Sequence, residues 1–301
     1  MGPARYMSQR LLSSVGKKSL EQHQKELMAR GLPKRRSIPG VEHVILIASG
    51  KGGVGKSTTA VNIALALSKA PYGLNVGILD ADVYGPSVPV MMNVSDRPLV
   101  DEKTNKMIPL TNYGLKCMSM GFLVADDAAA LIWRGPMVMG ALEKMAHGTE
   151  WSPLDVLVVD LPPGTGDVQL SLAQTVEIRG AVLVTTPQKV AVSDTRRGAT
   201  MFEKVGIPLL GVVENMCGIV CPDCGKLSDV FGSKLGLVDA MARELDVKVL
   251  GKVPLEEDLS VASDGGTPIV LSKPESKSAL CYGDIARQIL RQIEEEGKGK
   301  G

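Results

Sequence analysis

The stretch Val44-Ile-Leu-Ile-Ala-Ser-Gly50-Lys-Gly-Gly-Val-Gly55-Lys-Ser-Thr-Thr59 places an apolar run directly before a glycine-rich turn and a helix-forming run. Its spacing, Gly50-x-x-x-x-Gly55-Lys56-Ser57, fits the P-loop pattern, which requires a strand before the turn and a helix after it. Glycines adopt positive φ angles and turn backbone N–H groups toward a polyphosphate. The residues predicted to line this phosphate cradle are Gly50, Lys51, Gly52, Gly53, Val54, Gly55, Lys56, Ser57 and Thr58.

Two of these side chains have predicted roles of their own. We expect Lys56 to reach the β- and γ-phosphates and Ser57 to bind Mg²⁺. The helix that starts at this point would direct the positive end of its dipole toward the bound anion. The stretch therefore predicts a nucleotide-binding protein.

Two further apolar runs end in carboxylates. Val76-Gly-Ile-Leu-Asp80 leads into Asp82, and Val156-Leu-Val-Val-Asp160 leads into a Pro-Pro-Gly loop. Because ligands of open α/β sheets lie at the carboxyl ends of the strands, we expect these aspartates beside the nucleotide. Asp160 fits a Walker B aspartate that supports Mg²⁺. The fold class predicted is α/β, a P-loop NTPase with a mainly parallel sheet of about seven or eight strands and helices on both faces.

Composition favours one large α/β unit and argues against two kinds of partner. Of 301 residues, 44% are hydrophobic and 22% charged, which is ordinary for a globular chain. The net charge is +1 and aromatic residues make up 3%, so we expect no nucleic acid as partner. No apolar run reaches about 18 residues, and we expect no stable membrane insertion.

The amino-terminal segment differs from the rest of the chain. Its first twenty residues carry four basic residues, four serines and no acidic residue before Glu21. This composition is typical of a mitochondrial transit peptide, although an ordinary basic tail shares it. Arg10-Leu-Leu-Ser13 resembles a matrix-protease cleavage site, so the predicted location is the mitochondrial matrix. We predict a leader and linker over 1–40 and the P-loop NTPase domain over 41–301.

Cysteines supply the second candidate site. An odd number of them, five, with one Cys-x-x-Cys pair indicates metal or redox chemistry in a reducing compartment. In Cys221-Pro-Asp-Cys224, two thiolates on a knuckle can face one soft metal. The missing ligands have three possible sources: Cys217 with an outside ligand, distant Cys117 or Cys281, or the same knuckle of a second subunit. Four thiolates suit a 4Fe-4S cluster or Zn²⁺.

The additional lysine, Lys51, makes the loop resemble the deviant Walker A of the nitrogenase iron protein, MinD and ParA class. Several motifs follow in order: Asp80-x-Asp-x-x-Gly-Pro-Ser87, Asp160-Leu-Pro-Pro-Gly-Thr-Gly-Asp167, Glu214-Asn-Met216 and Cys221-x-x-Cys224. Together they resemble the Mrp/NBP family of iron-sulfur scaffold ATPases over residues 20–290. Within that family, Arg30-Gly-Leu-Pro-Lys34 and the basic leader are most similar to the mitochondrial branch.

The resemblance implies a function and several residue roles. It implies an ATP-sandwich homodimer in which Lys51 crosses to the partner's nucleotide, Asp82 positions or deprotonates the attacking water, and Asn215 and Pro254 contact the adenine. The implied cofactors are ATP, Mg²⁺ and a 4Fe-4S cluster shared by the dimer. The cluster would pass to apo iron-sulfur proteins, complex I subunits among them, with slow ATP hydrolysis. The catalytic residues would be Lys51, Lys56, Asp82 and Asp160.

Two other functions remain open at this point. A ParA- or MinD-like positioning ATPase would share the nucleotide site, but it would sediment with DNA or lipid in ATP, regardless of iron. A nucleotide-dependent chaperone stabilised by zinc would share both sites, but it would purify colourless with zinc.

Overall fold

The computed structural model describes residues 35–69, 71–123 and 135–298, and its first strand begins at Val41. From Arg36 onward the chain belongs to one compact unit. The predicted leader and the segment Arg30–Lys34 lie outside the described residues.

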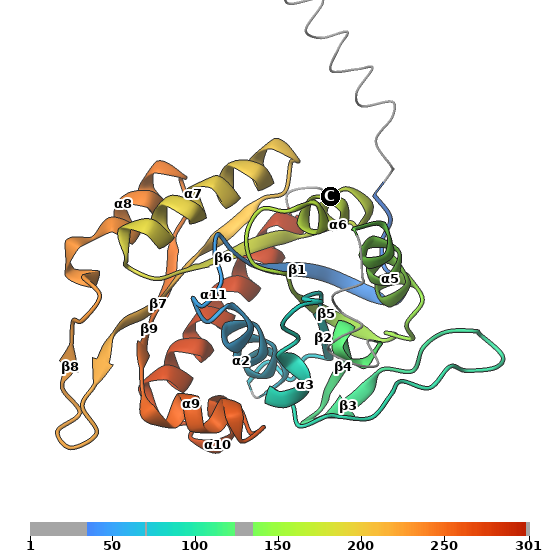
Figure 1. The fold of residues 1–301 in the computed structure, drawn as a ribbon, viewed down its shortest axis with the longest axis horizontal. Helices are drawn as coiled ribbons and strands as arrows, with labels where there is room; N and C mark the ends of the chain where they lie inside the picture. The colour runs from blue at the N-terminus through green and yellow to red at the C-terminus, as the bar shows by residue number, and fades with distance from the viewer. Residues whose placement is uncertain (1–34, 70, 124–134, 299–301) are drawn as a thin grey trace, which may run out of the picture. The chain divides into compact units, whose positions relative to one another are not determined.

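The described part of the chain forms one nine-stranded, mainly parallel sheet (Figure 1). Strand order is β3-β4-β2-β5-β1-β6-β7-β8, and β9 also pairs with β7. The strands that pair in parallel are β1 (Val41–Ser49), β2 (Val76–Asp80), β4 (Leu115–Ser119), β5 (Leu154–Asp160), β6 (Gly180–Thr185), β7 (Leu209–Val220) and β9 (Val249–Leu255). Two short strands, β3 (Leu110–Asn112) and β8 (Leu227–Ser228), pair antiparallel and raise the strand number above the expected seven or eight.

Helices cover both faces of the sheet, as predicted (Figure 1). One face packs against α2 (Lys56–Ser68), α3 (Val88–Met91), α9 (Glu257–Asp264), α10 (Ile269–Ser272) and α11 (Lys277–Lys298). The other packs against α5 (Gly135–His147), α6 (Asp167–Thr175), α7 (Lys189–Lys204) and α8 (Leu237–Glu244). Two 3₁₀ turns complete the description, η1 (Met120–Phe122) and η2 (Ser233–Leu235).

Strand β1 explains why the sheet needs cover on both sides. Ile45 and Ile47 join the core on one face, whereas Leu46 and Ala48 join the core on the other. Successive side chains of a strand point to opposite faces, so a continuous apolar run must be buried twice. No helix among the described residues is both long and apolar enough to cross a lipid bilayer.

Two strands extend beyond their apolar runs. The sequence predicts a strand over 209–213, but β7 continues to Val220 because its far end pairs with β8 and β9. The predicted strand over 247–251 is shifted to Val249–Leu255, since Leu255 pairs with Ile219 near the end of β7. Tertiary pairing, rather than local hydrophobicity, sets these boundaries.

Candidate functional site

The glycine-rich loop joins β1 to α2 as the P-loop pattern requires. Gly53 and Gly55 have φ angles of 76° and 80°, in the left-handed region. A Cβ on Gly55 would lie 2.1 Å from Asn215 Nδ2, and one on Gly50 would lie 2.3 Å from the backbone carbon of Asp194. Both positions therefore require glycine for space, and Gly55 also for its conformation.

A cavity of about 470 Å³ opens above this loop. Five parts of the chain line it: the P-loop with the end of β1, the segment after β2, helix α3, the loop after β5, and helix α9. The lining residues are Ser49, Lys51, Gly52, Gly53, Gly55, Lys56, Ser57, Thr58, Asp82, Gly85, Pro86, Ser87, Val90, Met91, Pro163, Ser263 and Asp264. The first backbone N–H groups of α2 have no acceptor inside the helix. The cavity is therefore a polar hollow at a helix N-terminus, which suits a phosphorylated ligand.

Two buried carboxylates stand side by side at the ends of neighbouring strands. Asp80 and Asp160 are register partners in the β2–β5 pairing, and both side chains are fully buried. Burial, and then the charge of Asp160, raise the pKa of Asp80 to about 7. Burial also raises the pKa of Asp160, although Lys56 opposes that shift. A cation beside this pair would favour its charged form.

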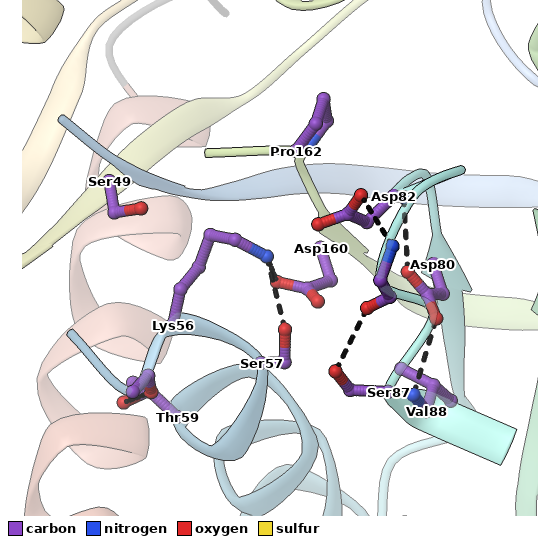
Figure 2. A network of polar contacts seen from close by, with 12 residues as sticks. Ser49, Lys56, Ser57, Thr59, Asp80, Asp82, Ser87, Val88, Asp160 and Pro162 are labelled. Atoms are coloured by element: carbon purple, nitrogen blue, oxygen red, sulfur yellow. Dashed lines mark hydrogen bonds and ion pairs between the residues drawn. The ribbon is translucent and has the colours of Figure 1, made fainter. Parts of the chain in front are cut away.

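Lys56 neutralises part of that charge (Figure 2). Its Nζ lies 2.5 Å from Asp160 Oδ1 and donates to Ser57 Oγ at 3.1 Å. The other oxygen, Asp160 Oδ2, is buried without a hydrogen-bond partner among the described residues. An orphan carboxylate oxygen beside a serine hydroxyl provides the oxygen ligands that Mg²⁺ prefers, so the residues present fit this ion.

Asp80 and Asp82 organise the segment that follows β2 (Figure 2). Asp80 accepts hydrogen bonds from the backbone N–H groups of Asp82 and Val88 and from Ser119 Oγ. Asp82 Oδ1 accepts from the backbone of Tyr84 at 3.1 Å, and the Asp82 side chain lines the cavity. Asp80 thus holds the loop that presents Asp82 to the cavity.

The remaining predicted nucleotide residues occupy three kinds of position. Lys51 is half-buried and lines the cavity, and Val54 is buried beneath the loop. Asn215 Nδ2 donates to Val54 O at 2.8 Å, while its buried Oδ1 has no partner among the described residues. Pro254 is buried on β9, where its carbonyl accepts from Ser278 Oγ. Neither Asn215 nor Pro254 lines the cavity, so their predicted contacts with adenine stay predictions.

The Cys-x-x-Cys pair occupies the turn between β7 and β8. Cys221 N donates to Lys226 O at 3.0 Å, and Gly225 N, at a φ of 66°, donates to Cys221 O at 2.9 Å. Cys221 is partly exposed and Cys224 is exposed. The backbone N–H groups of Cys224 and then Asp223 lower the pKa of the Cys221 thiol. This hairpin turn, residues 221–226, therefore presents two thiols near the surface, and its backbone favours the thiolate of Cys221.

The other three cysteines lie in different surroundings. Burial raises the pKa of Cys217 to about 11 and the pKa values of Cys117 and Cys281 to about 12. Within the described ranges, no third cysteine, histidine or carboxylate completes a metal-binding group with Cys221 and Cys224. The hairpin turn of one chain therefore offers two cysteine thiols.

Two features of the site are not evident from the sequence. Asp80 stands in the recognised Asp-x-Asp pattern, but only its register with Asp160 makes it a buried neighbour of the P-loop lysine. Ser263 and Asp264 close the cavity from α9, some two hundred residues further along the chain, and no motif marks them.

A parallel sheet whose first strand enters a lysine-containing glycine loop, opposite two strand-end aspartates, defines a P-loop NTPase of the deviant Walker A class. Residues 40–290 match the family described as ParA, NUBPL iron-transfer P-loop NTPase, and the chain belongs to this family. The fold class and the family resemblance predicted from the motifs are both confirmed.

Named relatives and a solved structure agree with this membership. The chain is 50% identical to the mouse (Mus musculus) "Iron-sulfur cluster transfer protein NUBPL", covering 94% of this chain and 88% of the relative. It is 51% identical to the Arabidopsis thaliana "Iron-sulfur protein required for NADH dehydrogenase, mitochondrial", covering 89% and 84%. A nucleotide-binding protein from Archaeoglobus fulgidus, solved with ADP, superimposes with a TM-score of 0.66 at 34% identity, covering 75% of this chain and 87% of that one.

Proposed function

We propose that this chain is an ATP-binding carrier that assembles a 4Fe-4S cluster and delivers it to apoproteins. The observation that carries the proposal is the surface hairpin with Cys221 and Cys224, whose backbone favours the thiolate of Cys221, on a chain of an iron-transfer family. The names of relatives from mouse and Arabidopsis, which refer to cluster transfer and to NADH dehydrogenase, support mitochondrial complex I subunits as recipients.

The cluster is held by two copies of the chain. One copy offers two accessible thiols, whereas Cys117, Cys217 and Cys281 have raised pKa values and remain protonated near neutral pH. Four thiolates are needed for a 4Fe-4S cluster, so the hairpins of two copies complete the site. Exposed apolar side chains beside the turn, Ile219, Leu227 and Val230, support a contact at this place.

The nucleotide is ATP, bound over residues 50–58. Lys56 exchanges Asp160 for the β- and γ-phosphates, which releases Asp160 to support Mg²⁺ together with Ser57. When bound there, Mg²⁺ would neutralise negative charge on the phosphates. Asn215, whose Oδ1 has a free lone pair, and the segment around Pro254 contact the adenine.

Hydrolysis is slow and needs both copies. Asp82, at the cavity wall and fixed by two backbone N–H groups, orients the attacking water. Lys51 reaches the nucleotide of the partner, where a cation stabilises the charge that develops on the phosphate. Hydrolysis then alters how the cluster is handed over.

The compartment is the mitochondrial matrix. Residues 1–40 serve as a basic leader and linker, and the P-loop NTPase domain covers 41–301. No stable membrane insertion is involved, and no nucleic acid, for which a net charge of +1 provides little attraction.

The test is anaerobic reconstitution with iron and sulfide, followed by transfer to an apo 4Fe-4S enzyme whose activity returns with its cluster. Wild type should take up about four irons per two chains and reactivate the enzyme. The Cys221→Ser/Cys224→Ser double variant should do neither, while Cys217→Ser, a change at a buried thiol, should behave as wild type. A wild type that binds zinc or no metal, yet hydrolyses ATP, would refute cluster carriage.

A further inference from the structure

Strand β7 contacts the nucleotide loop and continues into the cysteine hairpin turn before β8, and Figure 1 shows β7 running toward that turn. Through Asn215 it holds the nucleotide loop, because Asn215 Nδ2 donates to the carbonyl of Val54. Six positions later the same segment reaches Cys221, at the start of the hairpin turn. An extended chain of this length spans at most about 20 Å, so the two sites are joined by one short piece of backbone.

That piece contains an irregularity. Met216 has a φ of 58°, a left-handed conformation that is strained for a residue with a long side chain. The pairing with β9 shifts at the same place: Asn215 faces Val253 and Ile219 faces Leu255, so four steps on β7 match two on β9. A bulge of this kind bends a strand and re-aims the side chains beyond it.

The backbone is held on both sides of the bulge. Before it, Glu214 is buried, accepts a hydrogen bond from Ser233 Oγ and pairs with Lys252 Nζ at 3.2 Å. Beyond it, Ile219 pairs with Ser228 of β8, and Lys277 Nζ donates to Gly225 O in the turn. Backbone strain held between anchored segments is enriched at binding sites and switch regions.

We propose that the bulge at Met216 couples the nucleotide loop to the cysteine hairpin. Binding of ATP changes the position of the loop that Asn215 holds, and the backbone conformation of the bulge changes with it. The affinity of the hairpin for the cluster changes as a result. By linkage, the cluster must change the affinity for ATP by the same factor. The inference rests on the proposed function, since it requires that the hairpin bind the cluster.

Substitutions at Met216 separate the two arrangements. Glycine adopts the left-handed region freely and favours the bulged form by about tenfold over methionine. Valine, which is β-branched, disfavours that region and favours a regular strand. The two variants should therefore shift the affinity of the cluster-free protein for ATP in opposite directions, and both should reduce the coupling.

The experiment measures the dissociation constant of a non-hydrolysable ATP analogue with Mg²⁺, for full-length protein with and without reconstituted cluster. Wild type should show a difference of at least about fivefold, and Met216→Gly should reduce it to less than about twofold. Asn105→Gly is the matched control, because Asn105 also has a left-handed φ, of 54°. It lies in the loop before β3, and β3 and β8 are at opposite edges of the sheet (Figure 1).

The possible results test the coupling and the proposed function separately. If Met216→Gly keeps the wild-type coupling, or if wild type binds both cluster and nucleotide without coupling, the inference is wrong while cluster carriage stands. If wild type takes up no cluster, the proposed function itself fails. Should Met216→Val not fold, the comparison of Met216→Gly with Asn105→Gly remains decisive, because glycine fits the existing backbone at both positions.

Discussion

Replacing Asp80 with asparagine should stabilise the protein by an amount that grows with pH. Asp80 is fully buried, and burial followed by the charge of Asp160 raises its pKa to about 7. In the unfolded chain the pKa is about 3.9. Between these values the folded state binds a proton that the unfolded state releases, so wild-type stability is lost as the pH rises through this window. Asparagine removes that dependence.

The magnitude follows from the two pKa values. From pH 4 to pH 7 the free energy of unfolding of wild type should fall, relative to Asp80→Asn, by about 1.4 kcal/mol per pH unit and by about 4 kcal/mol in all. Above pH 7 the difference should level off. Asp80 accepts a hydrogen bond from the backbone N–H of Val88, which the amide nitrogen of asparagine cannot accept. The loss of this hydrogen bond should cost about 1 kcal/mol at every pH. The variant should be the more stable protein by about 3 kcal/mol at pH 8.

The assay is urea unfolding at a series of pH values, with a chelator and without nucleotide, followed by two spectroscopic probes to check two-state behaviour. Asp101→Asn is the control, because Asp101 also accepts two backbone N–H groups but lies half-buried in a surface turn. Asp101→Asn therefore measures what the loss of an acceptor for two backbone N–H groups costs without full burial. A pH-independent difference for Asp80→Asn would refute the assignment of a buried, protonated carboxyl at this position.

Three further predictions concern the loop and the cysteines. Gly55→Ala should weaken ATP binding by at least about tenfold, because the new Cβ would meet Asn215 Nδ2 and the backbone φ at this position is positive. Gly114→Ala is the control: its φ is also positive, but a Cβ there has open space, so the dissociation constant for ATP should not change. Lys51→Ala should retain single-chain ATP binding but lose most of its ATPase activity, measured by phosphate release at rising protein concentration. Iodoacetamide should alkylate Cys221 faster than Cys117 at pH 7, because a lowered pKa increases the thiolate and burial does the reverse; equal rates by mass mapping would contradict this.

Much of the fold can be predicted from local sequence patterns. Apolar runs that end in Asp80 and Asp160 mark strands buried on two faces, and the glycine spacing at 50–55 marks the turn that follows β1. These features depend on neighbours along the chain, so the pattern alone indicates them. The spacing of the P-loop residues and of the Cys-x-x-Cys pair is a local pattern of the same kind.

The rest depends on contacts between distant segments. No local pattern indicates that Asn215 bonds to Val54, or that Asp80 lies beside Asp160, because each contact arises only when the strands take their order in the sheet. The left-handed Met216 is a comparable case: methionine has no preference for that conformation, which occurs where the pairing of β7 with β9 shifts register. Sequence motifs thus indicate the two candidate sites, but not that β7 runs from one to the other.

The claim that two copies hold one cluster is tested most directly by native mass spectrometry of the anaerobically reconstituted protein. We expect a species with the mass of two chains and one 4Fe-4S cluster, absent from the Cys221→Ser/Cys224→Ser variant. Mixed dimers of wild-type and variant chains should not retain the cluster. A cluster on single chains, or one retained by mixed dimers, would contradict the shared site.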